Sequence, residues 1–194
     1  MYKNKMHCPQ ILVVGTLFLC SVCHVLGHDI AQNANAIPGR SLGKIRLGMS
    51  RLQVHSLLGK PSDDTYGGPR DYYFSSSSPQ RNEVYFNYNH GRVVSITFNA
   101  PSFKTKDGIS INSSLDQIQA HHRNLRNAVY LVQESFVYVY DDEKLGIAFL
   151  FQKGAIEVDD GKQMVPAPLK GNDKPILIAI HRPHEHYVPL LSSY

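Results

Sequence analysis

The sequence predicts an α+β fold of two tandem units, each a short helix (or helix pair) followed by a three- to four-stranded antiparallel β-meander. The first observation is a repeat, because the segment Ile45–Val54 recurs with similar spacing as Ile109–Ile118. The second is a helix-start signal at the same place in both copies. The third is a series of strand patterns after each copy. Together they predict a first unit over residues 41–101 and a second over residues 108–183.

Each predicted helix begins at a capping box. In this motif a serine hydroxyl and a glutamine side chain three residues later each bond the other's backbone N–H. The two boxes are Ser50 with Gln53 and Ser114 with Gln117. After the first box, apolar residues at helical spacing run up to Gly59, which predicts the end of a short helix.

Alternating apolar and polar residues predict the strands. The expected strands are residues 71–74, 83–88 and 92–98 in the first unit, and 129–140, 145–151 and 176–180 in the second. Polar segments between them, such as Ser75–Pro79 and Asp159–Lys174, predict exposed loops.

The N-terminus has the order of an export signal. Lys3 and Lys5 precede an apolar run from Ile11 to Leu26, which is short for a membrane span of about 20 apolar residues. Basic, apolar and small residues in this order predict a secretory signal over residues 1–27, with cleavage after Gly27 or, as the alternative, after Ala36. Residues 28–40 are then expected to form a flexible lead-in, and residues 184–194 a tail.

All three cysteines, Cys8, Cys20 and Cys23, lie in the predicted signal, so the exported chain would contain no thiol and no disulfide. A lipid anchor on a cysteine is the alternative, although Val22 occupies a position where lipidation signals have a small residue. We expect a periplasmic or secreted protein rather than an outer-membrane lipoprotein. Association with a membrane is expected only if the signal is uncleaved or lipidated.

The charge of the chain excludes one class of partner. The formal net charge of +4 falls to about +2 without Lys3 and Lys5, and the remaining basic residues are scattered along the sequence. No nucleic-acid partner is therefore expected.

Several segments together resemble a known family. These are the helix start Leu47–Ser50, the helix end Leu58–Pro61, the aromatic segments Tyr72–Phe74 and Tyr85–Tyr88, and the strand Gly91–Ile96. In order and spacing they resemble the SmpA/OmlA (BamE-like) module. The second copy follows the pattern less closely, since Asn112 and Ser113 replace Gly-Met. Two such modules in tandem resemble the architecture of the beta-lactamase inhibitor proteins (BLIP-like).

The resemblance implies an exported α+β binding module. BamE-like proteins assist an outer-membrane β-barrel assembly machine, and the inhibitor proteins are secreted and block the active site of an enzyme. The expected function is thus non-catalytic protein binding in the envelope or the secreted fraction, as an assembly factor or an inhibitor-like protein, with no cofactor. The identity of the protein partner does not follow from the resemblance.

The candidate binding residues are Tyr72, Tyr85 and Tyr138, because tyrosines on the solvent face of a meander offer the contact area typical of interfaces. The alternative function is a metal-binding protein or an enzyme that uses His181, His184 and His186. On an extended chain His184 and His186 would share a face.

Other titratable pairs are interpreted as structural. The acid pairs Asp141–Asp142 and Asp159–Asp160 fall in predicted turns and are expected to be solvated. Of His121 and His122, one is expected to face the edge of the core.

Overall fold

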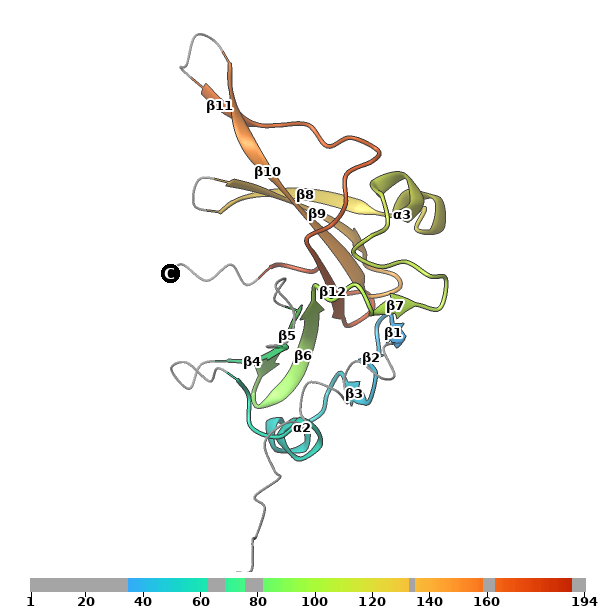
Figure 1. Ribbon diagram of the computed structural model, residues 1–194, viewed down its shortest axis with the longest axis vertical. Coiled ribbons are helices and arrows are strands. Elements are labelled where there is room, and N and C mark those ends of the chain that lie inside the picture. The colour runs from blue at the N-terminus through green and yellow to red at the C-terminus, as the bar shows by residue number, and fades with distance from the viewer. Residues whose placement is uncertain (1–34, 63–68, 76–81, 133–134, 159–162, 190–194) are drawn as a thin grey trace, which may run out of the picture.

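The computed structural model describes residues 35–62, 69–75, 82–132, 135–158 and 163–189. In this part of the chain there are two helices, α2 (Arg51–Leu58) and α3 (Leu115–His121), and two β-sheets (Figure 1). The predicted signal over residues 1–27 lies outside the described residues. Among the described residues, no helix combines the length and the apolar character needed to cross a membrane.

The larger sheet has eight strands and contains residues from both halves of the chain. Its order is β4-β5-β6-β12-β10-β9-β8, and β11 pairs with β10 beyond this path. The strands are β4 (Arg70–Ser75), β5 (Asn82–Asn89), β6 (Arg92–Phe98), β8 (Arg126–Val132), β9 (Ser135–Asp142), β10 (Ile147–Val158), β11 (Gln163–Pro166) and β12 (Leu177–His181). All neighbours pair antiparallel. The last strand among the described residues, β12, therefore lies in the middle of the sheet (Figure 1).

The smaller sheet has the order β3-β2-β1-β7. Its strands are β1 (Asn35–Ile37), β2 (Ser41–Leu42), β3 (Ile45–Arg46) and β7 (Lys104–Thr105). The parallel pairing of β1 with β7 joins Ala36 to Thr105 across 69 positions of sequence. Residues 35–37, which the sequence places in a lead-in, thus form a strand whose Ala36 is buried.

The predicted architecture of two tandem helix-plus-meander units is wrong. The protein is mostly β-structure, and its strands form two sheets of which neither corresponds to one unit. The segments expected to close separate units, Ile96–Pro101 and Ile178–Pro183, instead contribute strands that pair with each other, with Ile96 opposite Ile180. This pairing satisfies the backbone groups that two separate meanders would leave exposed at their edges. The broader α+β class holds.

Both helices begin where the capping boxes predict. Ser50 Oγ accepts a hydrogen bond from Gln53 N at 3.2 Å, and Gln53 Oε1 accepts one from Ser50 N at 2.8 Å. Ser114 and Gln117 repeat this arrangement at α3. The predicted helix starts are therefore confirmed, and the caps satisfy backbone donors that a helix cannot pair internally.

The two faces of the larger sheet are covered differently. We call the face that packs against α2, α3 and the smaller sheet the inner face; its core includes Phe86, Ile96, Phe149 and Ile180, with Val54 of α2 and Ile118 of α3. We call the opposite face the outer face. Its smaller core is formed by Val137, Val139, Ala148, Leu150, Ala179 and Tyr187. Figure 1 shows α3 and the smaller sheet on one side, and the chain leaving β12 on the other.

Candidate functional site

A row of directly paired residues crosses the outer face from one edge of the larger sheet to the other. Directly opposite residues of neighbouring strands project to the same face. The row is Tyr72, Tyr85, Thr97, Ala179, Ala148, Asp141 and Arg126. It has aromatic residues at one end, alanines in the middle and charged residues at the other end. The outer face thus offers two chemically distinct regions.

The aromatic end consists of Tyr72 on β4 and Tyr85 on β5. Their ring centroids are 5.5 Å apart with an interplanar angle of 36°. Arg70 Nη1 donates a hydrogen bond to Tyr72 Oη at 3.2 Å. Burial raises the pKa of the Tyr85 phenol well above its ordinary value, so this ring stays neutral. The pair is half-buried, rigid and amphipathic, which suits contact with another protein.

Tyr138, the third predicted binding residue, lies apart from this pair. It is on β9 opposite Phe151, whose side chain belongs to the inner core. Its hydroxyl donates a hydrogen bond to Ala167 O at 2.9 Å. The structure therefore brings Tyr72 and Tyr85 together on the outer face and places Tyr138 on the inner face.

The middle of the row is covered by residues 182–189, which we call the C-terminal segment. Tyr187 is only 5% exposed and packs against Ala148 and Ala179, the two small residues of the row. Its backbone N donates to Asp141 Oδ2 at 2.8 Å, and its hydroxyl lies 3.4 Å from Thr97 Oγ1. Tyr187 thus anchors the described part of the predicted tail on the sheet.

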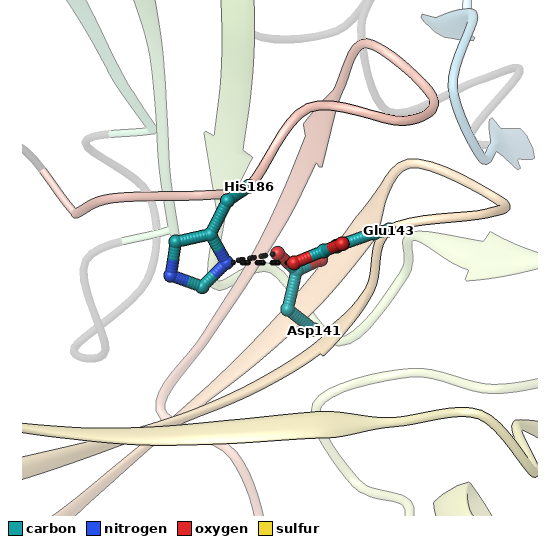
Figure 2. A group of neighbouring side chains, drawn as sticks. All are labelled: Asp141, Glu143 and His186. Atoms are coloured by element: carbon teal, nitrogen blue, oxygen red, sulfur yellow. Dashed lines mark hydrogen bonds and ion pairs between the residues drawn. The ribbon is translucent and has the colours of Figure 1, made fainter.

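The charged end is built around Asp141, whose side chain is fully buried. Asp141 Oδ1 lies 2.9 Å from His181 Nε2, and Asp141 Oδ2 lies 3.2 Å from His186 Nδ1. The same His186 nitrogen is 3.1 Å from Glu143 Oε1. Figure 2 shows His186 with its ring nitrogen directed at both carboxylates. Asp141, Glu143 and His186 are a group of three side chains that could hold a metal ion.

The predicted histidine cluster is therefore split by the structure. His181 and His186 both contact Asp141, whereas the side chain of His184 is exposed. His184 has a left-handed backbone conformation with φ of 64°, and its N–H donates to Glu143 O at 2.6 Å. The acidic members, Asp141 and Glu143, lie about 40 residues before the histidines, and the strand pattern gave no sign of this proximity.

The interpretation of Asp141 and Asp142 as solvated turn acids is wrong. Both are the last residues of β9 and are buried, and each contacts a histidine. Asp142 Oδ2 lies 3.0 Å from Nδ1 of His122, which is the buried member of the His121–His122 pair, as predicted. The two acids point to opposite faces because neighbouring strand residues alternate. The second predicted acid pair, Asp159–Asp160, lies outside the described residues.

Asp71 is a second fully buried carboxylate, on the inner face of β4. It accepts hydrogen bonds from Arg51 Nε at 2.9 Å and Tyr88 Oη at 2.8 Å, and lies 2.7 Å from His55 Nε2. Burial alone would raise the pKa of this carboxyl. The hydrogen bonds from Arg51, Tyr88 and His55 outweigh burial and hold its pKa below the ordinary value of 3.8. Asp71 thus fixes α2 to the larger sheet.

Residues 34–107 match the family model of the outer membrane protein assembly factor BamE domain. The matched segment starts one residue before β1 and ends two residues after β7, so it contains the smaller sheet, α2 and β4 to β6. The resemblance to a BamE-like module is confirmed for this segment. The tandem, BLIP-like architecture is not confirmed.

Two solved structures are similar to this chain. A DUF4309 family protein (YjgB) from Bacillus subtilis is 13% identical with a TM-score of 0.46, over 81% of this chain and 95% of that chain. An extracellular protein containing a SCP domain from Bacillus anthracis is 10% identical with a TM-score of 0.37, over 71% of this chain; our chain spans 44% of that protein. No curated protein matches this sequence.

Proposed function

We propose that the protein is an exported, non-catalytic module that binds another protein of the cell envelope. The main support is the match of residues 34–107 to the family model described as the outer membrane protein assembly factor BamE domain. The basic, apolar and small residues at the N-terminus support export. The proposed partner is therefore a protein component of envelope assembly.

The proposed contact surface is the aromatic end of the outer face. Tyr72 and Tyr85 belong to β4 and β5, both inside the matched segment. Their rings are held against each other, so little side-chain freedom would be lost on binding. Tyrosines of this kind are enriched among the residues that dominate interface energies.

Replacing Tyr72 by alanine is expected to weaken partner binding about 30-fold, equivalent to about 2 kcal/mol, because a rigid contact is removed. The measurement begins with a photoreactive residue at position 72 of the full chain in producing cells, which identifies the envelope protein that crosslinks. Affinity for that protein is then compared between the unmodified chain and Tyr72→Ala.

The control position is Leu52, which is 78% exposed on α2, the helix that packs against the inner face. A photoreactive residue at position 52 and the variant Leu52→Ala should give neither the crosslink nor the loss of affinity. Identical crosslinked products from both positions would contradict the proposed surface.

The exported form is expected to begin at His28. Cleavage after Ala36 would remove Asn35 and Ala36, two of the three residues of β1, which joins β2 to β7. Cleavage after Gly27 keeps that strand intact. The intact mass of the protein recovered from the envelope or medium distinguishes the two ends, and also reveals an attached acyl chain. A mass starting at Ile37 would contradict this prediction.

A further inference from the structure

We propose that Asp141, Glu143 and His186 form a binding site for a divalent transition-metal ion of the Zn²⁺ type. The site joins the end of β9 and the following turn to the C-terminal segment (Figure 2). This inference rests on the geometry of these three side chains and is independent of the proposed protein-binding function.

The spacing of the ligand atoms fits one ion. His186 Nδ1 lies 3.2 Å from Asp141 Oδ2 and 3.1 Å from Glu143 Oε1, and all three ligand atoms lie within 4.8 Å of one another. Zinc bonds to imidazole nitrogen and carboxylate oxygen are about 2.0–2.2 Å long, so ligand atoms around one tetrahedral ion are roughly 3.3 Å apart. A small closure of the site would bring all three ligand atoms within bonding distance of one ion.

The ligand set indicates the class of ion. One imidazole and two carboxylates are three protein ligands, which leaves a fourth position open for water or another ligand. Calcium and magnesium prefer sets made of oxygen alone, whereas an imidazole favours zinc, copper, iron or nickel. Zinc is therefore the probe of choice.

The surrounding contacts hold the ligands in place. Asp141 Oδ1 lies 2.9 Å from His181 Nε2, and Asp141 Oδ2 accepts the backbone N–H of Tyr187 at 2.8 Å. His186 Nε2, the nitrogen that would not bind metal, lies 3.5 Å from Tyr130 Oη. Such outer contacts fix the orientation of metal ligands. His181 is thus a positioning residue in this site.

A guanidinium competes with the ion for one ligand. Arg126 Nη1 lies 2.7 Å from Glu143 Oε1, and the Arg126 side chain is 69% exposed. This cation partly balances the two carboxylates, and its exposure allows it to turn into solvent when a metal ion binds. Removing it should therefore favour the ion.

The test is a calorimetric titration of the exported form, which lacks the three cysteines, with ZnCl₂ after chelator treatment and buffer exchange. One ion per chain is expected to bind, and the thermal unfolding midpoint should rise with zinc because the ion stabilises the folded state. Glu143→Gln and His186→Gln should each weaken binding by more than about tenfold, whereas Arg126→Gln should strengthen it.

His184→Gln is the matched control, since His184 lies two residues from His186 on the same segment and is also exposed, but lies outside the ligand group. It should bind zinc as the unmodified chain does. Far-UV circular dichroism and urea midpoints without zinc confirm that each variant folds. The proposal is overturned if the unmodified chain binds no zinc, if His184→Gln abolishes binding, or if folded Glu143→Gln and His186→Gln bind as tightly as before.

Discussion

Replacing Gly146 by alanine is expected to lower the free energy of unfolding by about 3–5 kcal/mol, a large effect for one methyl group. Gly146 has φ of +73°, a left-handed conformation that costs other residues about 1–2 kcal/mol. A Cβ atom there would lie 2.4 Å from His181 O, 2.8 Å from Gly39 Cα and 3.0 Å from Pro183 N. These are backbone atoms of segments that cross at this point, so they cannot move aside independently.

Hydrogen bonds between these segments explain why moving them apart would destabilise the fold. Gly146 O accepts from Gly39 N and from His181 N, both at 3.0 Å. Displacing either segment would break the link between the residues after β1, the turn before β10 and the end of β12. The measurement is urea-induced unfolding of the full chain, followed by circular dichroism.

Gly91→Ala is the matched control, because Gly91 has φ of +70° but a Cβ atom there would have nothing within 4 Å. It should lose only about 1–2 kcal/mol, the cost of the left-handed conformation. Equal losses in the two variants would show that the crossing of Gly146 with Gly39 and Pro183 does not constrain the fold.

Asp71→Ala is expected to cost about 3–5 kcal/mol, because it removes one partner of a buried charged network. Arg51, His55 and Tyr88 would lose their common acceptor, and the Tyr88 side chain is buried. The α2 helix would lose its charged attachment to β4, whereas the hydrogen bond from Arg51 Nη2 to Arg70 O at 3.1 Å does not involve Asp71. Asp107→Ala, at an exposed position, should be close to neutral in the same urea experiment.

Acid should weaken the attachment of α2 to β4 through Asp71. The folded-state pKa of Asp71 is lower than the ordinary value of 3.8, which we take for the unfolded chain. The carboxylate therefore contributes stability in full above that value, and this contribution is lost as the pH falls through the lowered pKa. Asp71→Asn should be less stable at neutral pH and lose less stability as the pH falls below 3.8. Parallel pH profiles for Asp71→Asn and the unmodified chain would contradict this assignment.

The local structure could be predicted because its signals are local. The capping boxes at Ser50 and Ser114 locate both helix starts, and the alternation of Val84 and Phe86 with polar neighbours identifies a strand with one buried face. The pairing of strands could not be predicted in the same way. Nothing in the sequence near Ile96 or Ile180 indicates that β6 and β12 are neighbours. Strands of two residues, such as β2 and β7, are too short to show an alternation of apolar and polar residues.

The candidate metal site could also be predicted only in part, because its residues are far apart in the sequence. The spacing of the histidines in the sequence identified them as a candidate cluster. The prediction that His184 and His186 share a face assumed an extended chain, in which side chains alternate between two faces. The left-handed backbone of His184, with φ of 64°, breaks this alternation. The carboxylates that accompany His186 come from the end of β9 and the following turn, where polar residues are typical of solvated turns. Only the tertiary structure buries Asp141 and places the C-terminal segment over it.

The central position of β12 has a consequence for how the protein is made. Residues 177–181 follow β6 and β10 along the chain, so β6 and β10 each have an unpaired edge during synthesis until β12 has been made. The larger sheet cannot be completed before β12 has been synthesised, and closing such long-range contacts is slow. Ending the chain before β12 would leave the edges of β6 and β10 unpaired.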